Sequence, residues 1–170
     1  MAIIKTVRGH KPVFGKDCFL ADNAVVVGEV TMGNSCTVWF NAVVRGDVHS
    51  ISIGDRTNIQ DGAIIHCTYQ KAKTVIGSQV SIAHQAVVHG CTIGDNVLVG
   101  MGAIIMDNAV IGENSVIAAG AVVLPGTRVE PGSIYAGIPA KRVKDIGEEM
   151  KAVIRRTAAN YPMYATWYKE

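Results

Sequence analysis

The 170-residue sequence has little that would direct it to a nucleic acid or a membrane. Its 16 Lys and Arg against 14 Asp and Glu leave a net charge of +2, and no basic block supports nucleic-acid binding. No apolar run has the about 20 residues that a membrane helix needs. The first ten residues, MAIIKTVRGH, lack the apolar stretch of a signal peptide. We therefore expect a soluble, cytoplasmic protein without a nucleic-acid or membrane partner.

Cysteine is also scarce, with 4 residues. In a cytoplasmic chain we expect reduced thiols rather than disulfides, although Cys18 and Cys36 are spaced so that they would stack one coil apart. Cys67 and Cys91 closely follow two histidines. Because Cys67 opens a loop and Cys91 sits at a corner, we expect structural roles for both rather than metal ligation.

What the sequence does contain is a six-residue period. A bulky aliphatic residue opens each unit, and a small or slim residue takes the fifth place. This pattern is typical of a hexapeptide β-helix and excludes the 3.6-residue period of an α-helix. The opening residues are Leu20, Val26, Met32, Val38, Val44, Ile53, Ile59, Ile65, Ile76, Ile82, Val88, Ile93, Val99, Ile105, Ile111, Ile117, Val123 and Val129.

Three units make one coil of a triangular prism, because the second place of every third unit is glycine. These glycines define side a, and the second and third units of each coil form sides b and c. The glycines are Gly15, Gly33, Gly54, Gly77, Gly94 and Gly112. Side chains alternate along a strand, so first places point inward and second places outward. The coil length departs from 18 residues only at the end of side c, after Val44, Ile65 and Val88. Loops that interrupt a scaffold beside polar residues are where function usually lies.

Residues 1–140 are expected to form the β-helix, with 133–141 as its exit, and residues 141–170 a C-terminal helical segment of the same domain. Asp145 followed by Glu148 resembles a capping box, and the helix should end or kink before Pro162. We expect it to lie along the prism, on its own chain or on a neighbour. Its apolar face is formed by Ile146, Met150, Val153, Ile154 and Ala158.

Three histidines are placed so that they could share a metal ion. His66 and His89 take the same outward place on consecutive coils of side c. Stacked strands lie about 4.8 Å apart, and a zinc–nitrogen bond is about 2.0 Å, so both imidazoles can reach one ion. His84 lies on side b, from which it could reach an ion held by a neighbour if side b of one subunit packs against side c of the next. A heterologous contact that closes makes a ring, and we expect a homotrimer.

Polar side chains occupy neighbouring columns: Arg45 and Asp47 on side c, and Gln60 and Asp61 on side b. Docking of the two sides would bring them around the metal. Three neutral imidazoles that leave a fourth position open are a catalytic zinc arrangement, in which the pKa of bound water falls to about 7. Gln60, Arg45, Asp61 and Asp47 are therefore the candidate catalytic side chains.

Three segments closely resemble the gamma-class carbonic anhydrase family: 44–47 (VRGD), 58–66 (NIQDGAIIH) and 81–90 (SIAHQAVVHG). The resemblance covers nearly the whole chain. It implies an all-β, left-handed parallel β-helix with a C-terminal α-helix, assembled as a trimer with Zn²⁺ or Fe²⁺ between subunits. His66 and His89 then look like ligands from one subunit and His84 like the ligand from its neighbour.

The function that this resemblance implies is reversible hydration of carbon dioxide to bicarbonate by metal-bound hydroxide. Gln60 looks like the residue that hydrogen-bonds the bound water, and Arg45, Asp47 and Asp61 like an interface ion network. The loops near the site lack the carboxylates that shuttle protons in active members of the family. His49 could relay protons instead, because histidine titrates near neutral pH.

Two other functions share this repeat. A CoA-dependent acyltransferase usually needs one histidine base and a groove between coils for the pantetheine arm, and three histidines with metal-ligand spacing would then be superfluous. A non-catalytic scaffold stabilised by metal would keep the histidines without the reaction. Metal analysis separates the acyltransferase from the other two, and a carbon dioxide hydration assay separates enzyme from scaffold.

Overall fold

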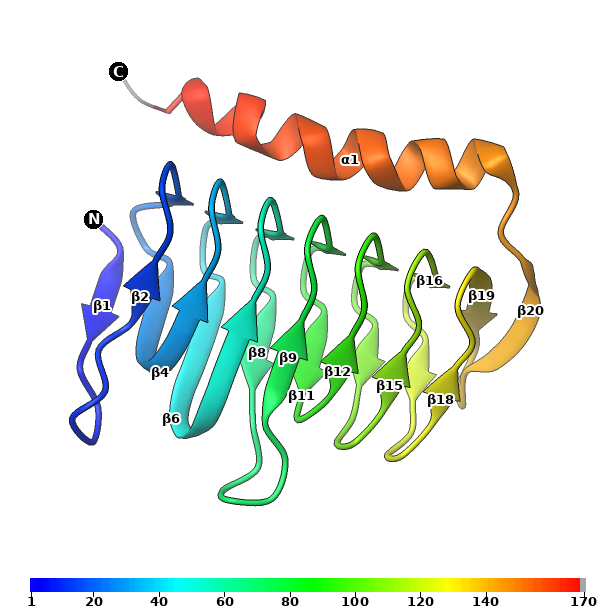
Figure 1. Cartoon of the computed structure of the whole chain (residues 1–170), viewed down its shortest axis with the longest axis horizontal. Coiled ribbons are helices and arrows are strands. Elements are labelled where there is room, and N and C mark those ends of the chain that lie inside the picture. Colours follow the sequence, from blue (N-terminus) through cyan, green and yellow to red (C-terminus); the bar gives the residue numbers. More distant parts are fainter. Residues whose placement is uncertain (169–170) are drawn as a thin grey trace.

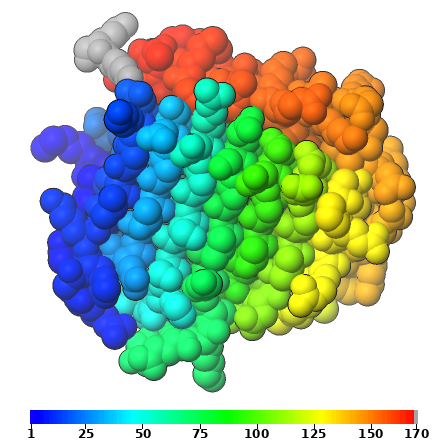
Figure 2. Space-filling model, in the orientation of Figure 1, coloured from blue at the N-terminus to red at the C-terminus, as the bar shows by residue number. Residues whose placement is uncertain are grey.

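The computed structural model describes residues 1–168, whose short strands wind into a parallel β-helix of about seven turns with one α-helix beside it (Figure 1). The expected all-β prism with a C-terminal helix is confirmed. Figure 2 shows the coils stacked in sequence order, with the helix along one edge. Within the described residues no helix is long and apolar enough to cross a membrane.

Strands on each side pair with the equivalent strand of the next coil. Side a holds β2 (Val13–Phe14), β9 (Thr74–Ile76), β12 (Thr92–Ile93), β15 (Val110–Ile111) and β18 (Arg128–Val129). Side b holds β3 (Phe19–Leu20), β5 (Thr37–Val38), β7 (Asn58–Ile59), β10 (Ser81–Ile82), β13 (Leu98–Val99), β16 (Val116–Ile117), β19 (Ser133–Ala136) and β20 (Lys141–Asp145). Side c holds β1 (Ile3–Lys5), β8 (Ile64–His66), β11 (Val87–His89), β14 (Ile104–Ile105) and β17 (Val122–Val123). Two longer strands, β4 (Val25–Met32) and β6 (Val43–Ile53), run from side c around the corner into side a.

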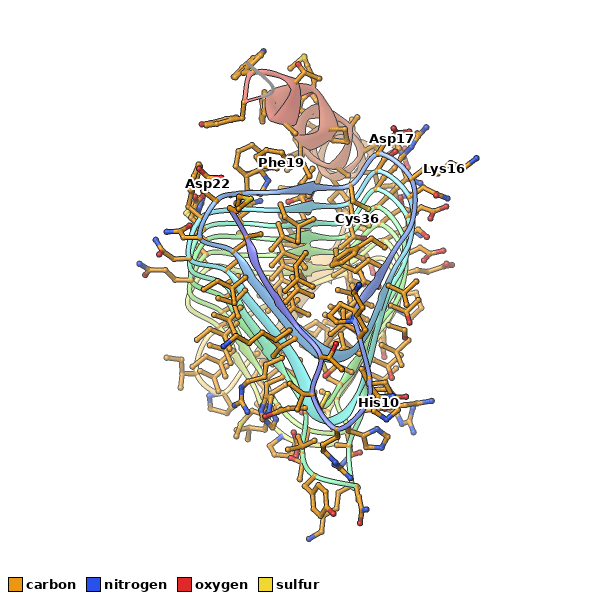
Figure 3. All side chains as sticks on the ribbon, turned by 90° about the vertical axis from the view of Figure 1, so that its left-hand side faces the viewer. His10, Lys16, Asp17, Phe19, Asp22 and Cys36 are labelled. Atoms are coloured by element: carbon orange, nitrogen blue, oxygen red, sulfur yellow. The ribbon has the colours of Figure 1, made fainter. Side chains whose placement is uncertain are left out.

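The six-residue period places its side chains as expected. First-place residues such as Val44 and Ile65 are 0 % exposed, as are fifth-place residues such as Ala103 and Ala121. The large and small ladders together fill the triangular interior, which Figure 3 shows end-on with Cys36 pointing inward. Burial of these aliphatic columns is the main stabilising contribution, because each coil alone leaves its apolar edge open.

The glycine column on side a allows the coils to touch. A Cβ added at Gly54 would lie 2.6 Å from the carbonyl carbon of Gly77, and one added at Gly15 would lie 2.6 Å from that of Gly33. Contacts below 3 Å would force the backbones apart. Side a is therefore built on backbone-to-backbone packing, and this explains why glycine recurs once per coil.

Helix α1 (Glu148–Thr166) lies across side b of its own chain (Figures 1 and 3). It contacts β5 and β10, and Ile154 and Ala158 are buried on its inner face. The open question of which chain the helix covers is settled in favour of its own prism. Side b is thus closed to any other partner along most of its length.

The expected N-terminal cap is wrong, and the helix does not end before Pro162. Helix α1 begins after Gly147, which has no side chain to cap it, while Asp145 ends β20 and accepts a hydrogen bond from Arg142 at 2.5 Å. The helix also runs through Pro162 to Thr166. The ring of Tyr161 packs edge-on against Trp39 of the prism, with centroids 5.6 Å apart, and this packing outweighs the preference of a residue before proline for extended backbone.

The C-terminal end of the prism differs from expectation too. The segment 133–136, expected as an exit, is strand β19, which pairs in parallel with β16 and antiparallel with β20. Residues 141–145 of the segment expected to be helical are therefore a strand. At the other end β1 pairs with β4, within the residues 1–140 that were expected to form the β-helix. Both additions cap coils whose backbone would otherwise lack partners.

Candidate metal centre

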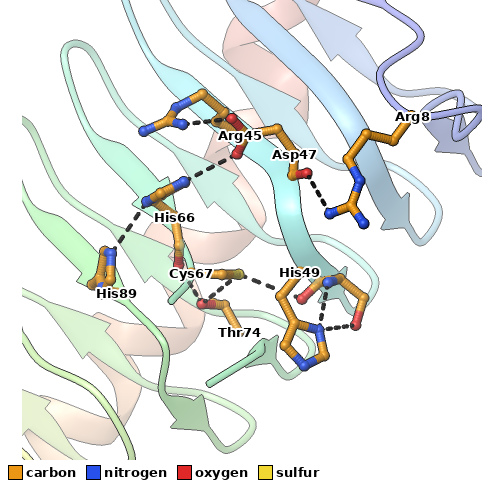
Figure 4. A network of polar contacts seen from close by, with 9 residues as sticks. Arg8, Arg45, Asp47, His49, His66, Cys67, Thr74 and His89 are labelled. Carbon is orange, nitrogen blue, oxygen red and sulfur yellow. Dashed lines mark hydrogen bonds and ion pairs between the residues drawn. The ribbon is translucent and has the colours of Figure 1, made fainter. Parts of the chain in front are cut away.

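His66 and His89 stand side by side on side c. Strands β8 and β11 are in parallel register with these two residues directly paired. Their ring centroids are 5.1 Å apart, and Nδ1 of His66 lies 3.2 Å from Nε2 of His89. The convergence expected from the repeat register is thus seen in the structure, and Figure 4 shows the two rings with their neighbours.

The other nitrogen of each ring faces a carboxylate. Nε2 of His66 lies 3.1 Å from Oδ1 of Asp47, and Nδ1 of His89 lies 2.5 Å from Oδ1 of Asp107. An ionised carboxylate can only accept hydrogen bonds, so each neutral imidazole carries its proton on the nitrogen beside the carboxylate. The two nitrogens that face each other are then both lone pairs.

This arrangement fits a metal ion. Two facing lone pairs at 3.2 Å repel each other unless a cation lies between them. Two zinc–nitrogen bonds of 2.0–2.1 Å at a tetrahedral angle would place the nitrogens about 3.3 Å apart. A carboxylate on the outer nitrogen is the usual partner of a metal-bound histidine, because it fixes the tautomer and the ring orientation.

Partial burial is the main reason that the imidazole of His66 favours its neutral form. Burial lowers the pKa of His66 despite its hydrogen bond to Asp47, and the nearby Arg45 guanidinium lowers it further. Burial alone would raise the pKa of Asp47, but hydrogen bonds from Arg45, at 2.6 Å, and from His66 hold it below its usual value. Arg45 and Asp47 therefore meet as expected: burial and Arg45 favour the neutral imidazole of His66, while Asp47 orients its ring.

His84 lies apart from this pair, at the corner between β10 and β11, where side b turns into side c. Its Nδ1 is 2.9 Å from Oδ2 of Asp61, and the two side chains are 43 % and 44 % exposed. All three histidines thus have a carboxylate on one ring nitrogen. Within residues 1–168 of one chain no three His, Cys, Asp or Glu side chains gather as a metal site.

The position of α1 corrects one part of the expected assembly. Because the helix covers side b, that side cannot pack broadly against a neighbour. Only its corner with side c, which carries His84 and Asp61, remains free to meet another subunit.

Gln60 is less accessible than expected. It is 4 % exposed, and its Nε2 donates a hydrogen bond to Oδ1 of Asn58 at 3.0 Å. Asn58 in turn donates to Oγ of Ser81 at 2.8 Å. This buried chain of polar groups lies on side b, away from His66 and His89 in the same chain. Its part in the site stays a prediction that depends on a second subunit.

Two polar neighbours of the histidines were missed in the sequence. Asp107 contacts His89, and the hydroxyl of Thr68 donates a hydrogen bond to Oδ2 of Asp107. Asp107 stands one place after Met106, and Met106 continues the outward column of His66 and His89 into the next coil. That register could have indicated Asp107, whereas Thr68 lies in an irregular loop that the repeat does not describe.

The remaining candidates have simpler surroundings. His49 accepts a hydrogen bond from the Ser50 N–H at 2.8 Å, and it lines a cavity of about 180 Å³ with Arg8, His10 and Asp47. The four cysteines are free thiols, as expected. Cys67 and Cys91 are each 1 % exposed and belong to the core, and burial raises the pKa of Cys91 to about 12.

Comparison with known proteins places the chain in a family. The model of the bacterial transferase hexapeptide (six repeats) matches residues 90–125. A probable carbonic anhydrase from Methanocaldococcus jannaschii is 52 % identical over 88 % of this chain and 93 % of its own length. The chain belongs to the gamma carbonic anhydrase-like family of hexapeptide-repeat proteins.

Other members of the gamma carbonic anhydrase-like family carry different names. Protein YrdA of Escherichia coli (strain K12), whose name states no activity, is 41 % identical over 98 % of this chain and 94 % of its own length. A solved structure of a hexapeptide transferase family protein from Anaplasma phagocytophilum superposes with a TM-score of 0.93, at 38 % identity and 98 % coverage of both chains. The names of these relatives therefore include a carbonic anhydrase and a transferase.

Proposed function

We propose that this protein is a metal-dependent carbonic anhydrase, which hydrates carbon dioxide reversibly to bicarbonate at sites shared between the subunits of a cytoplasmic homotrimer. The observation that carries the proposal is the pair of facing ring nitrogens of His66 and His89, 3.2 Å apart, with a carboxylate behind each ring. The names of relatives such as the Methanocaldococcus jannaschii protein support the same reaction.

The third ligand in this proposal is His84 of a second copy. Its Nδ1 is held by Asp61, which leaves Nε2 free at an exposed corner. Side c beside the histidine pair exposes apolar side chains that an interface would cover: Ile64, Ile104, Met106 and Leu124, each 37–46 % exposed. An exposed apolar patch beside a half-built site is typical of a subunit interface. A contact between unlike surfaces that closes after three copies gives three equivalent sites.

Zn²⁺ or Fe²⁺ bound there would act as a Lewis acid that makes water nucleophilic near neutral pH. The protein supplies the remaining parts of the reaction. Asp47 and Asp61 fix two of the imidazoles, and Arg45 holds Asp47. We assign to Gln60 the hydrogen bond that orients the water for attack on carbon dioxide.

Carbon dioxide is apolar and needs an apolar surface near the metal. A depression of about 340 Å³ next to His89 is lined by Val87, Ile104, Ile105, Met106 and Pro125, with Asp107 at its edge. It would hold the substrate without offering a competing ligand. The proton released with bicarbonate would leave through buffer, or through His49 on the adjacent corner.

The acyltransferase alternative rests on the repeat and on the transferase name of the relative from Anaplasma phagocytophilum. That chemistry needs one histidine base, whereas here three histidines each have a carboxylate partner. A carboxylate partner would suit a base as well as a ligand, but a single base does not explain why Nδ1 of His66 and Nε2 of His89 face each other at 3.2 Å. A metal-stabilised scaffold without activity is the second alternative.

The test is a carbon dioxide hydration assay on protein reconstituted anaerobically with Zn²⁺ or with Fe²⁺. We expect activity that rises with pH and increases with small buffers such as imidazole, because no loop carboxylate removes the proton. His89→Ala should abolish activity and His10→Ala, in an exposed loop, should not. A fully metallated protein that is inactive at every pH and buffer concentration would leave only the scaffold.

A further inference from the structure

We infer that Asp107 is a positioning residue that holds His89 in its metal-binding orientation, and that Thr68 in turn holds Asp107. The inference rests on the proposed function, because it concerns how that site is kept ready for a metal. Neither residue touches the facing nitrogens of the histidine pair, so both act through His89.

Both oxygens of Asp107 are engaged. Oδ1 lies 2.5 Å from Nδ1 of His89, and Oδ2 accepts the hydrogen bond from the Thr68 hydroxyl. A carboxylate held at one oxygen can still rotate about its side-chain bonds, whereas one held at both is fixed in plane and direction. Fixing the carboxylate fixes the ring and its tautomer, and this aims Nε2 of His89 at His66.

Gly90 gives a second, independent sign of this role. A Cβ at this position would lie 2.4 Å from Oδ1 of Asp107 and 2.8 Å from Cβ of Ala72, and the residue has φ +55°. The space directly after His89 is therefore reserved for the Asp107 carboxylate. A larger residue at position 90 would push the carboxylate away from the imidazole.

The loop that follows His66 supplies the contact that holds Asp107. Thr68 and Asp107 are 39 positions apart in sequence, so their contact ties the loop after β8 to the coil that follows β14. The loop is closed on itself by the bridge between Thr68 and Ala72. The longest coil of the prism thus supplies the group that orients Asp107.

The arrangement mirrors the one around His66. Oδ1 of Asp47 accepts a hydrogen bond from the imidazole of His66, and its Oδ2 accepts one from Arg45. In the same way Oδ1 of Asp107 accepts from His89 and its Oδ2 accepts from Thr68. Two carboxylates, each anchored from behind, hold the two rings with their free nitrogens together. Loss of such an outer partner typically weakens metal binding by about 10–100-fold.

The experiment measures Zn²⁺ affinity by competition with a chelating dye. Asp107→Ala should weaken binding by about 10–100-fold, Asp107→Asn, which keeps an acceptor, by less, and Thr68→Val by a few-fold. Asp95→Ala is the matched control: Asp95 accepts a hydrogen bond from the Ser78 N–H at 2.7 Å on another corner. It should lower the thermal midpoint and leave the affinity unchanged.

A second readout needs no metal. Nitrogen NMR of the metal-free protein should show His89 protonated at Nδ1 in the parent and a mixture of tautomers in Asp107→Ala. If Asp107→Ala binds Zn²⁺ within about threefold of the parent's affinity and His89 keeps its tautomer in that variant, the inference is overturned. If the parent binds neither Zn²⁺ nor Fe²⁺, the proposed function fails, while the tautomers still decide whether Asp107 orients His89.

Discussion

Each candidate ligand is an imidazole with its own carboxylate. Asp47 serves His66, Asp107 serves His89, and Asp61 serves His84. One histidine on an outer face could be a chance surface residue, but three with the same partner chemistry indicate one purpose. In each case the carboxylate takes the proton-bearing nitrogen and leaves the other one as a ligand.

At this scale His84 provides the first prediction. His84→Ala should reduce bound metal per chain strongly, because it removes one of three ligands. The thermal midpoint of the metal-free protein should stay within about 2 °C of the parent, since the side chain is 43 % exposed and outside the core. Metal analysis and calorimetry check this, and full metal content in the variant would show that His84 is not a ligand.

The second prediction concerns how the stability of the metal-free protein depends on pH. The pKa of His66 lies below its usual 6.5, mainly because burial disfavours the charged ring. The unfolded chain therefore binds more protons than the folded one as pH falls below that value. The contribution of neutral His66 to stability is complete above pH 6.5 and is lost as pH falls toward its folded-state pKa.

In metal-free protein the urea midpoint should accordingly fall further between about pH 7.5 and about pH 5.5 in the parent than in His66→Asn. Asparagine has no proton to bind in this range, so the difference isolates the imidazole. Equal falls in the two proteins would contradict the assignment of His66 as a partly buried neutral group.

Among the elements, the coils depend on a narrow ladder of small residues at their corners. Ala103 and Ala121 are both 0 % exposed and lie one coil apart. Ala103→Leu and Ala121→Leu should each lower the free energy of unfolding by about 1–3 kcal/mol, because the interior is already filled. Denaturant titration measures this, with Ala159→Leu on the exposed face of α1 as the control. Unchanged stability in both variants would mean that the corner is less tightly packed than described.

The elements also show what the sequence could and could not predict. The repeat predicted which residues face inward, and it aligned His66 with His89, because one rigid period governs every coil. The cap predicted at Asp145 was wrong because that residue pairs with Ser133 in the β19–β20 ladder. The helix end predicted before Pro162 was wrong because Tyr161 packs against Trp39 and the helix continues. Whether α1 covers its own chain could not be predicted from its apolar face alone.

For the whole molecule, the candidate site is divided between two places on the chain. The pair on side c and His84 at the corner between sides b and c are both exposed enough to meet another copy, and α1 leaves that corner free. Register predicted the pair, whereas the third ligand that we propose, His84, would come from a second subunit of the proposed trimer. Sequence gives no interface geometry, which is why Gln60 remains assigned by resemblance.

Mixed trimers test the central claim, a metal site shared between subunits, most directly. His84→Ala lacks the corner ligand and His89→Ala lacks one of the pair, so each variant alone should bind little metal. When equal amounts are unfolded together and reassembled, about one quarter of the interfaces should combine an intact pair from one chain with an intact His84 from the other, if mixing is random. The account predicts that metal content and hydration activity return to about a quarter of the parent's values. If the reassembled mixture forms mixed trimers but holds no more metal than the separate variants, the shared site is contradicted.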